Sequence, residues 1–199
     1  MKRADIISQA MPVQTGPIGR TLGRWLLGGL GWRVVGKLPE VDKVLIIVAP
    51  HTSNWDYVIG MGMKFFVGLR VRYLMKSEIN RWPFRALLKW TGGVPVYRFE
   101  KTDIIAQTVD WVKNEDNVWL AMAPEGTRSK LEKWKTGFLR IAHGANIPLL
   151  IIGIDARKKQ FVIDKVIWPQ ELEGDLTTQA KTIQTYFLDN FEGINPEKQ

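Results

Sequence analysis

The sequence predicts a single α/β domain whose sheet is mostly parallel or mixed and is covered by helices. Short, wholly apolar runs alternate with amphipathic stretches, the pattern expected when a sheet is buried on both faces. The chain has 199 residues, the usual size of one domain. Hydrophobic residues make up 45% and charged residues 24%, a balance that suits a folded core and excludes a disordered chain.

The strands are predicted from the apolar runs. Five runs are apolar enough to be buried strands, and a sixth alternates like a half-exposed strand. The five are residues 44–49, 71–75, 94–97, 118–123 and 149–154, and the sixth is residues 161–167.

The helices are predicted between these runs. Their expected positions are residues 57–66, residues 82–90, a helix beginning at Thr102, residues 137–143 and residues 178–191. The helix at 82–90 should stop at Gly92. In the last helix, Ile183 and Phe187 fall on one face and are expected to enter the core.

The N-terminal part of the chain is basic and amphipathic. Six basic residues stand against one acid within residues 1–37, and Ile18, Leu22 and Trp25 alternate with arginines. This pattern predicts a segment, residues 1–36, that lies in a membrane interface ahead of an α/β domain at residues 37–199. The alternative is that the segment simply packs on the domain. Six glycines between Gly16 and Gly31 weaken any helix there.

The composition also bounds the partners. The formal net charge is +8 and there are nine tryptophans, a combination that favours an anionic membrane surface over other polyanions. No apolar run approaches the roughly 18–20 residues of a spanning helix, so we expect a peripheral protein on the cytoplasmic face.

There is no cysteine, and only two histidines are present, which excludes a thiolate nucleophile and a three-histidine zinc site. We expect no metal and no cofactor.

One polar cluster follows the first buried strand. Pro50 leads into His51, and Asp56 lies five residues further on. If Ser53 or Asn54 caps a following helix, Asp56 lies in the first turn and can point back at the loop. An aspartate bonded to one ring nitrogen fixes the histidine tautomer and leaves the other nitrogen free as a base. On spacing alone, a capping loop whose histidine fills a polar notch is an equal alternative.

A second polar cluster follows the strand at residues 118–123. It contains Glu125, Gly126, Thr127 and Arg128. Ligands of open α/β sheets bind at the carboxyl ends of the strands, and a guanidinium suits phosphate oxygens. The alternative is a solvated basic loop in which Glu125 pairs with a neighbouring cation.

Four blocks of sequence resemble those of the glycerolipid acyltransferase family, whose best-known members are the 1-acyl-glycerol-3-phosphate acyltransferases. In family order they are His51-x4-Asp56, Gly93-Val94-Pro95-Val96-Tyr97-Arg98, residues 123–129 and Ile147-Pro148-Leu149-Leu150. They span residues 50–154, about half of the chain. The His-x4-Asp block followed by Pro-Glu-Gly-Thr-Arg-Ser is the specific combination. Ala123 replaces the usual aromatic residue and Pro50 a common asparagine, and neither change touches a group that would do chemistry.

The resemblance implies a reaction. An acyl group would pass from acyl-CoA or acyl-carrier protein to a hydroxyl of a lysophospholipid, with 1-acyl-glycerol-3-phosphate giving phosphatidic acid as the first expectation. His51 would be the general base and Asp56 would orient it. No covalent acyl-enzyme is needed, which agrees with the absence of cysteine.

The resemblance also assigns binding roles. Arg98 and Arg128 would hold the acceptor's phosphate, helped by Thr127 and the backbone of Gly126. Glu125 would position Arg128 or an acceptor hydroxyl. Lys135 is a lesser candidate for phosphate, and the oxyanion donor is not identified.

Several alternatives stay open at this point. The acceptor could be glycerol 3-phosphate or another lysolipid, or the same pair could activate water in a lipid thioesterase or hydrolase. A non-catalytic lipid-binding or nucleic-acid-binding domain is the third class, but no nucleic-acid motif is present, so nucleic acid is not expected as a partner. The other histidine, His143, precedes a glycine at a predicted helix end and is expected to be structural.

Overall fold

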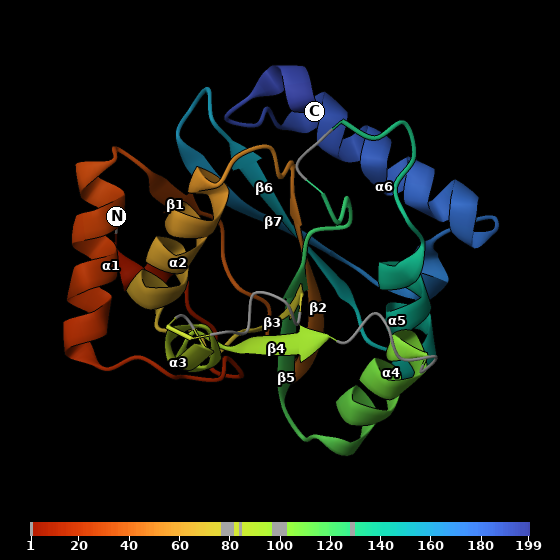
Figure 1. Ribbon diagram of the computed structural model, residues 1–199, viewed down its shortest axis with the longest axis horizontal. Helices are drawn as coiled ribbons and strands as arrows, with labels where there is room; N and C mark the ends of the chain where they lie inside the picture. The colour runs from red at the N-terminus through yellow and green to blue at the C-terminus, as the bar shows by residue number, and fades with distance from the viewer. Residues whose placement is uncertain (1, 77–81, 84, 97–102, 128–129) are drawn as a thin grey trace.

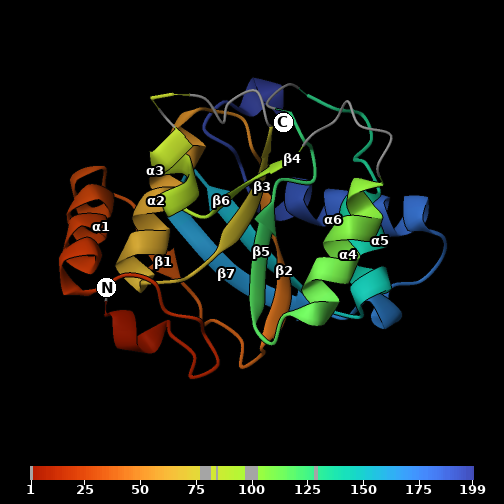
Figure 2. The same ribbon diagram turned by 60° about the horizontal axis from the view of Figure 1, so that its bottom comes forward.

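The protein is described here by a computed structural model covering residues 2–76, 82–83, 85–96, 103–127 and 130–199. At its centre is a seven-stranded sheet with helices on both faces (Figures 1 and 2). The strands are β1 (Arg33–Val35), β2 (Lys43–Ala49), β3 (Arg72–Lys76), β4 (Gly93–Val96), β5 (Val118–Met122), β6 (Leu149–Asp155) and β7 (Gln160–Ile167).

The strand order confirms the predicted fold class. Across the sheet the order is β1-β7-β6-β2-β5-β3-β4, and every neighbouring pair is parallel except β6 with β7. The sheet is therefore mixed and mostly parallel. In such a sheet the carboxyl ends of the parallel strands meet at one edge, where the two polar clusters were expected.

The helices form two layers around the sheet. They are α1 (Pro17–Gly29), α2 (Trp55–Val67), α3 (Arg85–Trp90), α4 (Ile104–Asn114), α5 (Gly137–Ala145) and α6 (Leu176–Asn190), with short 3-10 turns η1 (Arg3–Asp5), η3 (Pro169–Glu171) and η4 (Pro196–Lys198). α1 and α2 cover one face of the sheet, and α4, α5 and α6 cover the other (Figure 1).

The central strand β2 shows why its sequence is apolar from Val44 to Ala49. Val44 and Ile46 belong to the core beneath α1 and α2, whereas Leu45 and Ile47 belong to the core beneath α5 and α6. All four side chains are buried. Because successive residues of a strand point to opposite faces, a strand covered on both sides has no polar position.

Most predicted elements form, and their ends differ by a few residues. The helix predicted over 82–90 begins only at Arg85, because Trp82 and Pro83 form a turn that leaves the Trp82 ring exposed. The helix expected from Thr102, a residue outside the described part, begins at Ile104. Asp103 sets that start, since its carboxylate accepts two of the helix's free N–H groups.

The N-terminal segment is integrated into the domain. Despite its glycines it contains a 13-residue helix, α1, that packs against α2. A Cβ on Gly23 would lie 2.3 Å from the backbone nitrogen of Phe66, so this glycine is needed for the close approach of the two helices. β1 pairs with β7, so the boundary expected at residue 36 directly follows a strand of the sheet.

Candidate functional site

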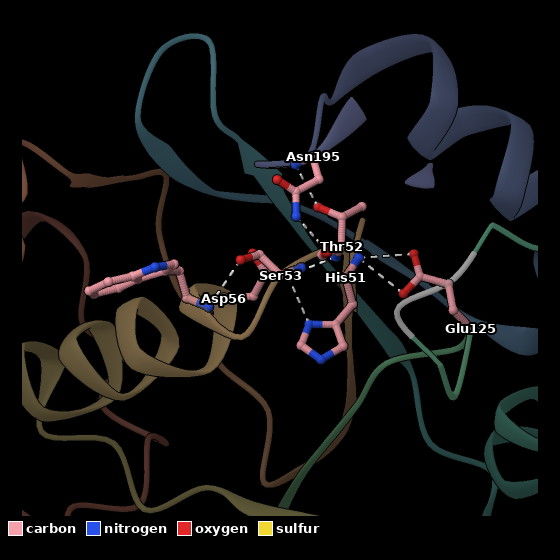
Figure 3. Close-up of polar contacts among 7 residues, drawn as sticks. His51, Thr52, Ser53, Asp56, Glu125 and Asn195 are labelled. Atoms are coloured by element: carbon pink, nitrogen blue, oxygen red, sulfur yellow. Dashed lines mark hydrogen bonds and ion pairs between the residues drawn. The ribbon is translucent and has the colours of Figure 1, made fainter. Parts of the chain in front are cut away.

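The sheet brings the two polar clusters together. Ile47 of β2 lies beside Met122 of β5, so the two strands end at the same edge of the sheet. His51 follows the end of β2 by two residues, and Glu125 follows the end of β5 by three. The loop after β2 and the loop after β5 therefore meet, as the close-up in Figure 3 shows.

His51 and Asp56 form a pair. Nδ1 of His51 lies 3.1 Å from Oδ2 of Asp56, whose side chain is only 1% exposed. Asp56 lies in the first turn of α2 and reaches back toward the loop, as the spacing predicted. Figure 3 shows the second ring nitrogen of His51, Nε2, on the side of the ring away from Asp56. A base aimed at a substrate needs this free nitrogen.

The backbone of the loop holds the aspartate. Oδ2 of Asp56 accepts hydrogen bonds from the N–H groups of Thr52 and Ser53, at 2.8 and 2.7 Å. Oγ of Ser53 in turn accepts the N–H of Trp55 at 3.2 Å, which satisfies one free donor at the start of α2. Oδ2 of Asp56 is therefore contacted by three nitrogens, Nδ1 of His51 and the backbone N–H groups of Thr52 and Ser53. The position of Asp56 relative to His51 is fixed by the loop itself.

Glu125 binds the same loop from the other side. Both of its carboxylate oxygens accept the backbone N–H of His51, each at 3.0 Å. Burial raises the pKa of Glu125 to about 7, and the hydrogen bond from His51 and the charge of its ring oppose that shift only in part. The expected partners were Arg128 or an acceptor hydroxyl. In the structure Glu125 contacts the backbone of His51. Arg128 lies outside the described residues, so its contact with Glu125 stays a prediction.

The remaining binding candidates are distributed as follows. Gly126 has a φ of 64°, a left-handed conformation that favours glycine in the turn after Glu125. Thr127 is partly buried in the same turn. Lys135 is exposed before α5, and no contact in the described part of the chain joins it to the histidine–aspartate pair. Arg98 follows β4 by two residues and lies outside the described residues.

The end of the chain contacts the loop after β2, which is not evident from the sequence. Asn195 donates its backbone N–H to Oγ1 of Thr52 at 3.0 Å, and its side-chain amide donates to the Thr52 carbonyl oxygen at 3.1 Å. The two residues are 143 positions apart. One nearby residue reflects this close approach: a Cβ on Gly193 would lie 2.6 Å from Oγ1 of Thr52.

The other histidine, His143, makes a contact between two helices. Nε2 of His143, near the end of α5, lies 2.8 Å from Oε1 of Gln179 on α6. This contact ties two helices together, which agrees with the prediction. Within the described ranges, no group of three or more histidine, cysteine, aspartate or glutamate side chains could hold a metal ion.

Fold and site together define an α/β domain with a histidine–aspartate pair at the carboxyl edge of its sheet. A family model described as "Acyltransferase" matches residues 33–155, which is more than half of the chain and contains both members of the pair. The chain belongs to this acyltransferase family and is an O-acyltransferase enzyme.

Individual relatives agree with this assignment. The chain is 26% identical to the 1-acyl-sn-glycerol-3-phosphate acyltransferase of Haemophilus influenzae, over 91% of this chain and 81% of that protein. It is 29% identical to an Arabidopsis thaliana protein named "Probable 1-acyl-sn-glycerol-3-phosphate acyltransferase 5", over 81% of this chain but only 45% of that longer protein.

A solved structure has the same fold. The crystal structure of the 1-acyl-sn-glycerophosphate acyltransferase from Thermotoga maritima superposes with a TM-score of 0.62. The match covers 86% of this chain and 76% of that one, at 16% sequence identity. At this identity the likeness concerns the fold alone, and it supports the single α/β domain described above.

Proposed function

We propose that the protein transfers an acyl group from acyl-CoA or acyl-carrier protein to the free hydroxyl of a lysophospholipid, with 1-acyl-glycerol-3-phosphate as acceptor and phosphatidic acid as product. The observation that carries the proposal is the 3.1 Å contact between His51 Nδ1 and Asp56 Oδ2, in a chain of the acyltransferase family. The names of both curated relatives support this choice of acceptor.

His51 is the general base in this proposal. Nε2 takes the proton of the acceptor hydroxyl while the oxygen attacks the thioester carbonyl carbon. The tetrahedral intermediate then expels the thiol by breaking its C–S bond, and the imidazolium returns the proton to the departing sulfur. Asp56 holds Nδ1–H and stabilises the positive ring between the two steps. One ester forms, one thioester breaks, and no acyl-enzyme intermediate occurs.

The acceptor's phosphate needs cationic and N–H donors near this pair. We assign them to Arg98, Arg128, Thr127 and the backbone of Gly126, with Lys135 as a lesser candidate. The support for this assignment is the sequence pattern and the position of Gly126 and Thr127 directly after Glu125, which contacts the His51 loop.

The membrane-binding surface in this proposal is the outer face of α1. Gly23 and Leu27 face α2, whereas Ile18 and Trp25 point outward and are 80% and 75% exposed. An exposed apolar stripe on a helix that also carries Arg24 is suited to the interface of an anionic membrane. In the described residues, no helix has the length and apolar character needed to cross a membrane.

A transfer assay tests the proposed activity. Purified protein is incubated with labelled acyl-CoA and either 1-acyl-glycerol-3-phosphate, glycerol 3-phosphate, a neutral lysolipid or no acceptor. We expect labelled phosphatidic acid with the first acceptor and little free fatty acid without an acceptor. Release of free fatty acid at the same rate with and without acceptors would instead identify a thioesterase.

A further inference from the structure

The chain that follows α6 returns to the loop that carries His51. After Asn190 it crosses the carboxyl end of β6, where the ring of Phe191 packs directly on Gly153 and leaves no room for a Cβ there. The carbonyl of Glu192 accepts the N–H of Ala156 at 2.8 Å. In Figure 3, Asn195 of this C-terminal segment, residues 191–199, lies above the loop that carries His51 and Thr52.

Thr52 is the point of contact. It is 1% exposed, and its N–H, its hydroxyl oxygen and its carbonyl oxygen each take part in a hydrogen bond. Its hydroxyl oxygen and its carbonyl oxygen both accept hydrogen bonds from Asn195, and its N–H donates to Oδ2 of Asp56. The peptide units on both sides of Thr52 are therefore held, one of them directly adjoining His51.

This residue is linked to the catalytic pair through the aspartate. Oδ2 of Asp56 contacts Nδ1 of His51 and at the same time accepts the N–H of Thr52. A shift of Thr52 would move the base and its orienting carboxylate relative to each other. Reactions that depend on such geometry lose about 100-fold in rate for a misplacement of about 1 Å.

We propose that Asn195 is a positioning residue of the acyl-transfer reaction, holding the His51–Asp56 pair in its working geometry through Thr52. The inference rests on the function proposed above. The alternative role of Asn195 is structural: its hydrogen bonds would only anchor the end of the chain to the domain. The segment is also attached to the domain elsewhere, since the carbonyl of Glu192 accepts the N–H of Ala156 and the ring of Phe191 packs on Gly153. Loss of the Asn195 side chain should therefore perturb the loop without releasing the segment.

Three substitutions test the proposal on the full-length enzyme. Asn195→Ala removes the amide donor, Thr52→Val removes the hydroxyl acceptor at nearly constant shape, and Thr52→Ser restores that acceptor. Asn190→Ala is the matched control, because among the described residues its side-chain amide bonds only the carbonyl of Tyr186, one turn earlier in α6. For each variant, kcat, the KM values of donor and acceptor, and the thermal midpoint are measured.

We expect kcat to fall at least tenfold in Asn195→Ala and Thr52→Val, with both KM values within about twofold of wild type. Thr52→Ser should recover at least a third of the wild-type kcat, and Asn190→Ala should match wild type. An unchanged kcat in the folded Asn195→Ala and Thr52→Val proteins would overturn the positioning role. An inactive wild-type enzyme with every acceptor would instead refute the proposed function.

Discussion

The backbone N–H of His51 donates to both carboxylate oxygens of Glu125, at 3.0 Å from each. The proposed base is thus held at its ring by Asp56 and at its backbone by a residue from the next strand of the sheet. Since these contacts come from loops after β2 and β5, the geometry of the site depends on the register of the two strands.

Glu125 should make stability depend on pH. Its pKa is raised from 4.5 to about 7 in the folded protein, so the folded state binds the proton more tightly than the unfolded state. The stabilisation is complete below pH 4.5 and is lost as the pH rises through 7, a change of about 3 kcal/mol. In urea unfolding, the wild type should lose that amount relative to Glu125→Gln between pH 4.5 and 8. A difference that stays constant over this range would contradict the burial of the carboxyl.

Replacing Asp56 should affect catalysis far more than folding. Asp56→Asn keeps the shape but loses the charge that stabilises the imidazolium, so we expect kcat to fall by about 10²- to 10⁴-fold. Asp155→Asn is the control, because Asp155 is an equally buried carboxylate at the same sheet edge, paired with Arg157 and Lys158. Steady-state kinetics should show a much larger loss of kcat in Asp56→Asn than in Asp155→Asn. Equal losses would show that a buried charge, rather than a catalytic pair, is being removed.

Membrane binding should depend on the outer face of α1. Trp25→Glu places a charge on the exposed apolar stripe and should reduce sedimentation with anionic liposomes at least tenfold. Leu188→Glu, on an exposed position of α6, should bind like the wild type. Substitution is a sharper test than deletion, because Leu27 of the same helix is fully buried. Undiminished binding of Trp25→Glu would place the membrane surface elsewhere.

Two glycines of α1 should respond in opposite directions. At Gly23 an added Cβ would lie 2.3 Å from the Phe66 backbone, so Gly23→Ala should destabilise the protein by about 1–3 kcal/mol. At Gly28 nothing lies within 4 Å, so Gly28→Ala should stabilise it by about 0.5–1 kcal/mol through helix propensity alone. Thermal unfolding measures both. A stabilised Gly23→Ala would show that α1 and α2 are not in such close contact.

The features that sequence predicts here are those encoded over short stretches. The central runs of β2 and β6 are apolar because both faces of these strands are covered, so the two strands are evident from their residues alone. The pairing of His51 with Asp56 is equally local. It needs only a strand end, a five-residue spacing and a helix that starts in between.

The features that sequence misses depend on the tertiary structure. α1 forms although its glycines disfavour a helix, because Gly23 lets it pack closely on α2. β1 has only three residues and exists through its pairing with β7. The contact between Asn195 and Thr52 spans 143 positions, and no periodicity can reveal such a pair.

His51 is the proposed base, and the rate of acyl transfer in variants that change one histidine at a time tests this role directly. With labelled acyl-CoA and 1-acyl-glycerol-3-phosphate, His51→Ala should lose at least about 10³-fold in kcat while its thermal midpoint stays close to wild type. His143→Gln, which changes the chain's only other histidine, should keep nearly full activity. A folded His51→Ala enzyme that retains more than a few per cent of the wild-type rate would contradict the mechanism.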